Sequence, residues 1–305
     1  MARAVRSFLS VPATGSGMAE KGLATGADGV FLDLEDAVAP ARKEEARAGV
    51  VRALSELDWG GRKRIFRMNA VGTPYFYGDV IEVVEGAGEA LEAILVPKVR
   101  RAGDLYAVDA LLSAVEAGAG LPVGRIELEA QIEDAEGLEE VGRISRASRR
   151  LTALHFGPGD FAASVGAPQA AIGVRDEWDE AYPGHRFSYA MQRLVVSARA
   201  AGLRVYDGPS ADYRDREALE RSCRLARALG YDGKWCIHPK QVEVVNRVFT
   251  PTEREVERAR EIVRAYREAS ESGSGAIVVG GEMVDAASVQ MARRTLLGAG
   301  EEGEV

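Results

Sequence analysis

The strongest constraint on the fold is a repeated alternation of short β-type runs with helical segments over about 235 residues. Such alternation is typical of βα units wound around a parallel sheet. The β-type runs are Val5–Ser10, Gly29–Leu34, Arg64–Met68, Ala93–Val96, Ile126–Ile132, Thr152–Phe156, Arg204–Tyr206 and Gly233–Ile237. Because there are eight runs at this spacing, the sequence predicts an α/β fold, a closed (β/α)8 TIM barrel.

Amphipathic segments between these runs carry apolar residues at steps of three and four, as the outer helices of such a barrel would. They are Gly17–Thr25, Ala41–Leu57, Asp104–Ala117, Tyr189–Ala201 and Arg216–Leu229. The stretch from Gly157 to Gly184 is instead long and rich in Gly, Ala and Pro. We therefore interpret it as an extended βα loop, a kind of segment that usually carries function.

The pattern changes after Pro239. A helix is predicted over Gln241–Phe249, and Thr252 begins a long charged helix that ends near Glu271. An apolar run with a central Gly-Gly pair predicts a hairpin, and a last helix follows over Ala286–Leu297. We expect a TIM-barrel catalytic domain over residues 1–239 and a small helical C-terminal lid or oligomerisation segment over residues 240–305.

Composition narrows the class of protein. The chain has 305 residues, of which 46% are hydrophobic, and a formal net charge of −8. These values exclude a disordered chain and disfavour a nucleic-acid binder. No run approaches the roughly 18 apolar residues that a membrane span needs, and the N-terminus does not resemble a signal peptide. The sequence therefore predicts a cytoplasmic protein with no membrane association.

Polar residues follow most of the predicted strands, at the barrel end where active sites of this fold gather. They include Asp33, Glu35, Asp36, Arg67, Asn69, Lys98, Gln131, Glu133, Asp134, Asp160, Lys234, His238 and Gln241. Glu133 and Asp160 end adjacent strands, where two carboxylates could hold one magnesium ion and leave positions for water and substrate. The alternative is that each caps the helix that follows it.

Three further features have both a functional and a structural interpretation. Arg67 follows a buried run and could bind substrate, or it could form an ion pair with Glu35 or Asp36 that links two strands. The FGPGD segment could bind an anion through its backbone N–H groups. His238 is more typical of a structural histidine than of a catalytic base. The motifs of serine hydrolases, P-loop nucleotidases, zinc proteases and dinucleotide-binding domains do not occur.

Nine segments in order resemble those of the HpcH/HpaI aldolase family, in its group of citrate lyase β subunits and malyl-CoA lyases. They are RSFLSVPAT, ADGVFLDLEDAV, IFRMN, AILVPKV, QIED, ALHFGPGDFAASVG, DGPSADYRD, GYDGKWCIHPKQ and GGEMVDAASVQMARRTL. Within the group, the long FGPGDFAASVG loop, WDEAYPG and VYDGPSADY resemble malyl-CoA and β-methylmalyl-CoA lyases more closely. The SVPAT segment departs from the PGS of many members, which affects the loop after the first strand.

The resemblance implies a role for each matching residue. Glu133 and Asp160 would hold Mg²⁺, with Mn²⁺ as a possible substitute, and Arg67 would contact the reacting carbonyl or enolate oxygen. Asp285 would be the acid/base, contributed by the C-terminal segment of a neighbouring subunit. From its position alone Asp285 is equally suited to cap the helix that follows it. A base supplied by a neighbour implies a homo-oligomer, a trimer or a hexamer.

The implied reaction is the reversible, Mg²⁺-dependent cleavage of (S)-malyl-CoA, or of β-methylmalyl-CoA, to glyoxylate and acetyl-CoA or propionyl-CoA. The CoA phosphates need cations near the barrel mouth, for which Arg6, Lys21 and Lys98 are candidates. Alternatives are a citramalyl-CoA or citryl thioester lyase, a malyl-CoA thioesterase and a CoA-independent pyruvate aldolase. From another class, the chain could be a non-catalytic CoA-binding subunit.

Overall fold

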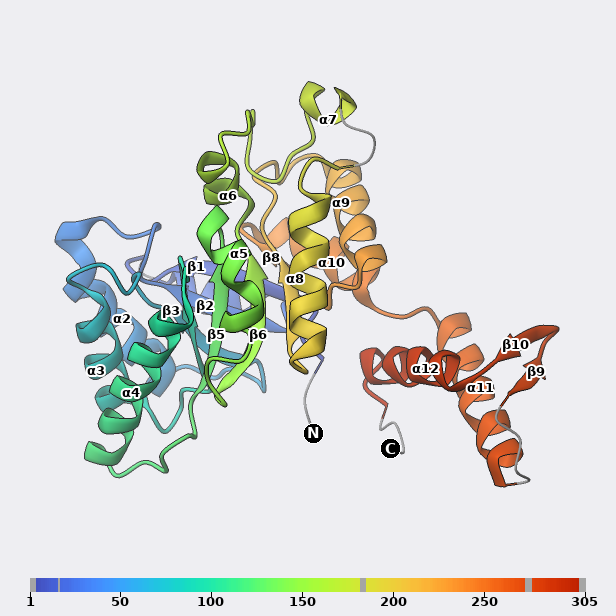
Figure 1. The fold of residues 1–305 in the computed structure, drawn as a ribbon. Helices are drawn as coiled ribbons and strands as arrows, with labels where there is room; N and C mark the ends of the chain where they lie inside the picture. Colours follow the sequence, from blue (N-terminus) through green and yellow to red (C-terminus); the bar gives the residue numbers. More distant parts are fainter. Residues whose placement is uncertain (1–3, 16, 182–184, 272–275, 302–305) are drawn as a thin grey trace. The chain divides into compact units, whose positions relative to one another are not determined.

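The computed structural model describes residues 4–15, 17–181, 185–271 and 276–301. Its first eight strands run parallel and pair in chain order, and β1 also pairs with β8, which closes the barrel (Figure 1). They are β1 (Ser7–Pro12), β2 (Gly29–Asp33), β3 (Lys63–Arg67), β4 (Ala93–Val96), β5 (Glu127–Ile132), β6 (Leu151–Phe156), β7 (Arg204–Asp207) and β8 (Gly233–Cys236). All eight predicted runs are strands, and the predicted (β/α)8 barrel is confirmed.

Helices follow the strands and connect each one to the next. They are α1 (Met18–Leu23), the 3₁₀ turn η1 (Pro40–Arg42), α2 (Lys43–Glu56), α3 (Phe76–Ala87), α4 (Ala102–Gly118), α5 (Ala135–Ile144), α6 (Pro158–Ser164), α7 (Glu177–Ala181), α8 (Ser188–Ala200), α9 (Arg216–Leu229) and α10 (Pro239–Phe249). The five predicted barrel helices are confirmed as α1, α2, α4, α8 and α9.

Sequence reasoning missed four of these helices. Two glycines each in α3 and α5 weaken the helical signal, yet parallel strands can be joined only by such crossovers. The long segment after β6 contains α6 and α7 rather than loop alone. Its residues 182–184, within the predicted aromatic segment, lie outside the described part of the chain.

Alternation along each strand decides which side chains enter the barrel. The interior holds a buried apolar cluster that includes Phe8, Phe31, Ile65 and Trp235. On β5 the residues at every second position are polar, so they share the face that points into the barrel, where a half-exposed strand would have its apolar residues. Of these, Glu129 and Gln131 are buried. The barrel interior is therefore apolar on most strands and polar along β5.

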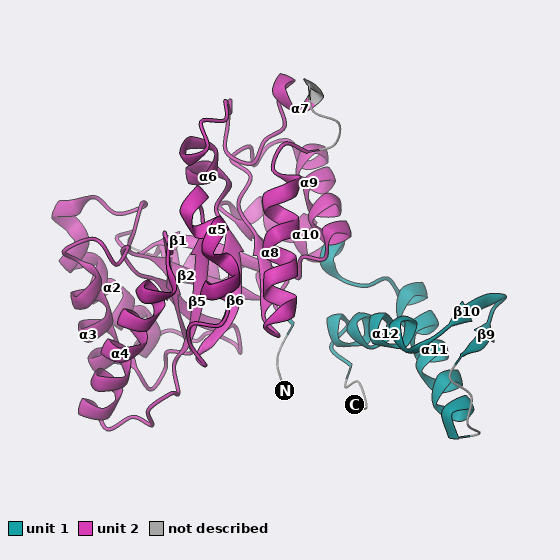
Figure 2. Ribbon diagram, in the orientation of Figure 1, with its two compact units in different colours: residues 1–4, 247–305 teal, residues 5–246 magenta. Residues whose placement is uncertain are grey.

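The chain divides into two compact units, one of residues 5–246 and one of residues 1–4 and 247–305 (Figure 2). The division falls within α10, whereas the sequence places it before that helix. The second unit contains α11 (Glu253–Glu271), β9 (Ile277–Val279), β10 (Glu282–Val284) and α12 (Ala286–Gly298). Gly280 and Gly281 have φ of 59° and 85°, as the tight turn of an antiparallel hairpin requires, so the predicted hairpin is confirmed. No helix in the described residues is long and apolar enough to cross a membrane.

Candidate active site

Arg67 ends β3 and lies buried at the C-terminal end of the barrel. Its Nε and Nη2 donate to the two carboxylate oxygens of Asp33 on β2, at 2.8 and 2.6 Å, and its Nη1 lies 3.0 Å from Glu35 Oε2. Burial alone would lower the pKa of Arg67, but the Asp33 carboxylate outweighs it and raises the pKa. The predicted ion pair between the second and third strands therefore exists, with Asp33 as its main partner and Asp36 outside it.

Gln131 connects Arg67 with Glu133. Its amide oxygen accepts from Arg67 Nη1 at 3.4 Å, and its amide nitrogen donates to Glu133 Oε2 at 2.6 Å. Because an amide both accepts and donates, it can join a guanidinium to a carboxylate, which neither a carboxylate nor an apolar side chain could do. Sequence reasoning noted Gln131 without giving it a role. Its place two residues before Glu133 could have indicated this role, because residues two apart along a strand point to the same side.

Glu133 is buried just past the end of β5, and its Oε1 accepts from the backbone N–H of Lys98 at 2.8 Å. The alternative that Glu133 caps α5 is wrong, because Asp134 is the cap and its Oδ1 accepts from Gly137 N at 2.7 Å. Gly157 leaves the space that the Glu133 side chain fills. A Cβ at Gly157 would come within 2.4 Å of Glu133 Cβ.

Asp160 lies in the first turn of α6, and its side chain is 49% exposed. The residue at the cap position of α6 is Gly157, so Asp160 does not cap this helix. Asp160 is close enough to Glu133 for its charge to raise the pKa of that buried carboxyl, and its Oδ2 lies 3.8 Å from Lys98 Nζ. The structure thus brings Asp160, Glu133 and Lys98 together at the barrel mouth.

Lys98 holds this carboxylate cluster together. It is the one residue other than glycine among those described with positive φ, at 51°, a strained conformation that often marks a functional position. Its Nζ lies 2.7 Å from Glu35 Oε1 and 3.1 Å from Asp36 Oδ1. The ammonium of Lys98 therefore balances acidic charge at the site, and the contact with a CoA phosphate that the sequence suggested stays a prediction.

The electrostatics of the site suit a divalent cation. Burial raises the pKa of Glu133 well above its ordinary value, and the nearby charge of Glu35 raises it further. Both hydrogen bonds of Glu133 come from uncharged donors, a backbone N–H and an amide. Five carboxylates lie around Arg67 and Lys98, and the buried ammonium of Lys43 is a third cation near Asp33, Glu35 and Asp36. The remaining excess of negative charge and of oxygen ligands is what Mg²⁺ would neutralise.

The protein ligands at the site are few. In the described ranges no group of three His, Cys, Asp or Glu side chains could hold a metal ion by itself. If Glu133 and Asp160 held Mg²⁺, water and substrate oxygens would have to fill the remaining positions, as is common for this ion.

Of the other two cations proposed for CoA, Arg6 lies at the far end of the barrel, whereas the contact of Lys21 with CoA stays a prediction. Arg6 precedes β1 at the opposite end of the barrel, and its guanidinium pairs with Asp28 at 2.6 Å. The expectation that Arg6 lies near the mouth is therefore wrong, because strand direction puts residues before a strand at the far end. Lys21 is exposed on α1.

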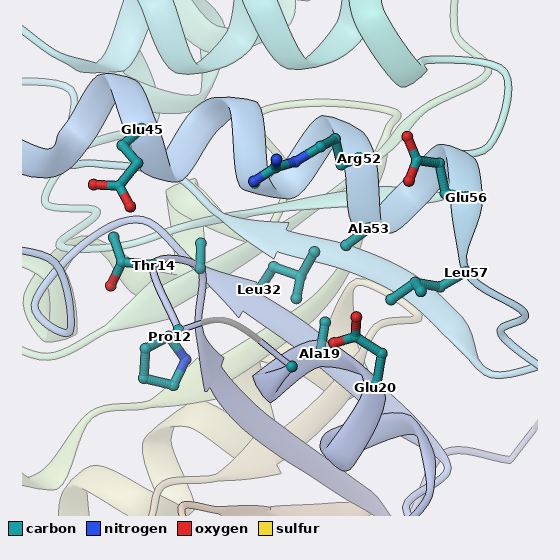
Figure 3. Close-up of a pocket in the computed structure, with 14 residues that line it drawn as sticks. Pro12, Thr14, Ala19, Glu20, Leu32, Glu45, Arg52, Ala53, Glu56 and Leu57 are labelled. Carbon is teal, nitrogen blue, oxygen red and sulfur yellow. The ribbon is translucent and has the colours of Figure 1, made fainter.

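A cleft beside the loop after β1 has a volume of about 360 Å³. Figure 3 shows it between α1, which contributes Glu20, and α2, which contributes Glu45 and Arg52. Its lining includes Thr14 of the loop after β1 but none of the carboxylates around Arg67. This cleft is therefore separate from the candidate active site.

The remaining predicted residues have clear local roles. His238 stacks on Tyr213 at 4.2 Å between ring centres, and its Nδ1 accepts from Lys240 N, which supports the structural interpretation. Asp285 caps α12, where it accepts from Ser288 N at 2.9 Å. That backbone hydrogen bond lowers the pKa of Asp285. The cap geometry is thus present, and the acid/base role of Asp285 stays a prediction.

Comparisons with known proteins identify relatives over nearly the whole chain. The chain is 40% identical over 297 residues to an L-malyl-CoA/β-methylmalyl-CoA lyase of Cereibacter sphaeroides, covering 95% of this chain and 93% of that protein. It is 35% identical over 299 residues to a (3S)-malyl-CoA thioesterase of the same species, covering 95% and 93%. A solved structure of the Mycobacterium tuberculosis protein CitE with magnesium, acetoacetate and coenzyme A is similar, with a TM-score of 0.75, 28% identity and coverage of 98% and 99%. A family model for HpcH/HpaI aldolase/citrate lyase matches residues 6–239, and the chain belongs to this family.

Proposed function

We propose that this protein is a Mg²⁺-dependent carbon–carbon lyase that cleaves (S)-malyl-CoA to glyoxylate and acetyl-CoA, and β-methylmalyl-CoA to glyoxylate and propionyl-CoA. The observation that carries the proposal is the meeting of Glu133, Asp160 and Arg67 at one end of the barrel. The 40% identity to a lyase of that name over nearly the whole chain supports the same substrate class.

Glu133 and Asp160 would hold the ion. When bound there, Mg²⁺ supplies a Lewis acid for the carboxylate and aldehyde oxygens of glyoxylate. Arg67 donates three hydrogen bonds to Asp33 and Gln131, which use three of the five N–H groups of a guanidinium. The second N–H on Nη1 faces Glu35 Oε2 at 3.0 Å, so the second N–H on Nη2 is the one that can be directed at the thioester oxygen, where negative charge develops as the enolate forms.

In the condensing direction Asp285 takes a proton from the α-carbon of the acyl thioester. The electron pair left behind moves onto the thioester oxygen facing Arg67, and the α-carbon then attacks the aldehyde carbon of glyoxylate. The new alkoxide takes up the proton that Asp285 removed, which gives the hydroxyl of malyl-CoA and returns Asp285 to its carboxylate form. Cleavage reverses these steps, with Asp285 removing the hydroxyl proton before the carbon–carbon bond breaks.

The base is proposed to come from a neighbouring subunit, so the active form would be a homo-oligomer, a trimer or a hexamer. Asp285 lies in the second compact unit, whereas Glu133, Asp160 and Arg67 lie in the first. The contacts of Asp285 at the helix cap lower its pKa, which keeps the carboxylate ionised but makes it a weaker base, so its release from the cap would strengthen it as the proton acceptor.

The test is condensation by the purified protein. Acetyl-CoA, glyoxylate and Mg²⁺ should give a malyl thioester, detected by mass spectrometry, and propionyl-CoA should give the methylated product. Absence of both products across a range of Mg²⁺ and Mn²⁺ concentrations would refute the proposal. Product from pyruvate and acetyl-CoA, or from oxaloacetate and an acetyl thioester, would instead indicate citramalyl-CoA or citryl thioester cleavage.

A second candidate activity is hydrolysis of malyl-CoA, because the chain is also 35% identical to a protein named as a malyl-CoA thioesterase. The two activities are distinguished by their products. Lysis of malyl-CoA releases glyoxylate and acetyl-CoA, whereas hydrolysis releases malate and free CoA, which a thiol reagent detects. Free CoA without glyoxylate would favour the thioesterase.

A further inference from the structure

A chain of buried side chains runs through the barrel interior and ends beneath Arg67. Lys63 Nζ lies 2.5 Å from Glu129 Oε1, and Glu129 Oε2 lies 2.6 Å from His155 Nε2. The indole nitrogen of Trp235 then donates to His155 Nδ1 at 2.7 Å. These four residues come from β3, β5, β6 and β8, so the chain joins distant parts of the barrel wall.

The direction of each hydrogen bond in this series follows from the chemistry of its donor and acceptor. An indole N–H can only donate, so His155 Nδ1 must accept and the imidazole proton lies on Nε2. That proton is donated to Glu129, whose carboxylate also takes the Lys63 ammonium. Burial would raise the pKa of Glu129, but Lys63 and His155 outweigh it and hold the pKa at about 2. The Glu129 carboxylate is therefore ionised near neutral pH, and the hydrogen bond to His155 fixes the orientation of the Trp235 ring.

The Arg67 guanidinium lies over the face of the Trp235 ring. Arg67 Cζ lies 5.6 Å from the Trp235 ring and 5.9 Å from the Phe31 ring, within the range of cation–π contacts. Phe31 and Trp235 pack against each other at 4.6 Å between ring centres. Trp235 is only 3% exposed, so its ring cannot turn without disturbing the interior. Asp33 thus holds the guanidinium by its edge, and Trp235 supports its face.

We propose that Trp235 is a positioning residue for Arg67, held in place by its hydrogen bond to His155. The inference rests on the proposed function, in which Arg67 faces the developing oxygen charge. The contacts with Asp33, Gln131 and Glu35 all lie at the edge of the guanidinium and leave it free to tilt out of its plane, whereas a fixed ring beneath it limits that tilt and so sets the direction of the remaining N–H on Nη2. A shift of about 1 Å in such a donor can lower turnover about a hundredfold.

The kinetic test compares two variants of Trp235. Trp235→Phe keeps an aromatic face and loses the N–H, whereas Trp235→Leu loses both. We expect kcat to fall about tenfold or more in Trp235→Leu and less in Trp235→Phe, with KM for the acyl-CoA within about twofold in both. Arg67→Lys should cost much less in the Trp235→Leu background than in the wild type, since the arginine is no longer held. Fully additive effects of the two substitutions would overturn the proposal.

The matched control is Trp59→Leu. Trp59 is a tryptophan as buried as Trp235, at 3% exposed, and its indole nitrogen donates to Ala53 O at 3.0 Å, outside the chain that reaches Arg67. Loss of this ring should lower the thermal midpoint as a core truncation does, while kcat changes less than threefold and the effect combines additively with Arg67→Lys. If Trp59→Leu lowers kcat as much as Trp235→Leu, the effect is general loosening of the core and the proposal is wrong.

A readout that needs no activity separates this inference from the proposed function. The Nε–H resonance of Arg67, identified by its absence in Arg67→Lys, should exchange slowly with water in the wild type. In Trp235→Leu we expect its chemical shift to change and its exchange to accelerate at least tenfold. An unchanged shift and exchange rate would overturn the inference even in an active enzyme. If Trp235→Leu shows these changes but the wild type forms no malyl thioester, the inference stands and only the proposed substrate is refuted.

Discussion

Glu133 shows the conflict between stability and function at the scale of one residue. It is buried, it has no cationic hydrogen-bond partner, and its pKa is raised by burial and by neighbouring carboxylates. A carboxylate in such surroundings costs folding free energy unless a cation is added. The arrangement is typical of an ion-binding residue rather than of a structural one, which would have a guanidinium or ammonium beside it.

Glu133→Gln should therefore abolish the effect of Mg²⁺ on stability. In the wild type, saturating Mg²⁺ should raise the free energy of unfolding by about 2–3 kcal/mol at a hundredfold excess over Kd. The variant should show no such increase, should be at least as stable as the wild type in a chelator, and should lose turnover by about a hundredfold or more. Thermal unfolding with and without Mg²⁺, together with the condensation assay, measures all three.

The control for this variant is Asp134→Ala, which removes the neighbouring carboxylate that caps α5. We expect it to cost about 1 kcal/mol of stability and to leave the Mg²⁺ response intact. A wild-type response to Mg²⁺ in Glu133→Gln would show that Glu133 does not hold the ion.

Arg67→Lys is the second prediction at this scale. Lysine has one ammonium and cannot hold the two oxygens of Asp33 while directing a further N–H group at the substrate. The loss of one donor to a developing oxyanion costs about 3–4 kcal/mol, so kcat should fall by about 10² to 10³-fold. Steady-state kinetics measures this, and a change in KM alone would assign Arg67 to ground-state binding.

At the scale of elements, the junction of β6 and α6 provides the space for the site. Gly157→Ala would put a methyl group within 2.4 Å of Glu133 Cβ and 2.5 Å of its Oε2. We expect Glu133 to be displaced, with loss of the Mg²⁺ response and of most activity. Gly103→Ala in α4 is the matched control, since nothing lies within 4 Å of its added Cβ. It should leave activity unchanged, and Mg²⁺ titration of both variants tests the contrast.

The polar interior of β3, β5 and β6 predicts a pH dependence of stability. The pKa of Glu129 is about 2 in the folded protein, below its ordinary value of 4.5, because Lys63 and His155 outweigh burial. Its stabilising effect is therefore complete above about pH 5 and is lost as the pH falls towards 2, up to about 3 kcal/mol. Urea unfolding from pH 6 to pH 2.5 should show this decrease in the wild type.

Glu129→Gln should be less stable at neutral pH and should lose less stability on acidification. Glu127 is the control, because it contacts the same Lys63 ammonium with a side chain that is 44% exposed. Glu127→Gln should retain the wild-type dependence on pH. Equal slopes for Glu129→Gln and the wild type would contradict the assignment of the acid-sensitive group.

At the scale of the whole molecule, the proposed reaction takes its base from a neighbouring subunit. Arg67→Lys and Asp285→Asn protomers should each be nearly inactive. If the base comes from a neighbour, mixing the two and allowing subunit exchange should restore activity, because some sites then combine an intact Arg67 with an intact Asp285. If activity does not recover although exchange has been verified, either the base comes from the same subunit or Asp285 is not the base. Light scattering on the same samples determines whether the protein is a trimer or a hexamer.

The sequence was sufficient for the order and type of most elements. Short apolar runs separated by amphipathic segments predict a barrel because parallel strands must be joined by crossovers. The helix α9 was predicted to the residue, since its apolar spacing and its Asp215 cap are local signals. The helices α3 and α5 were missed because their glycines weaken the local signal, and the surrounding barrel stabilises them instead.

Sequence alone determined which residue types end the strands, and hence that carboxylates and an arginine lie at one end of the barrel. Only the tertiary structure decided their partners. It paired Arg67 with Asp33, connected it through Gln131 to Glu133, and put Arg6 at the far end. The physical reason is that strand order and alternation fix the face and end of each side chain, whereas ion pairing depends on distances that closure of the barrel sets between residues far apart in the chain.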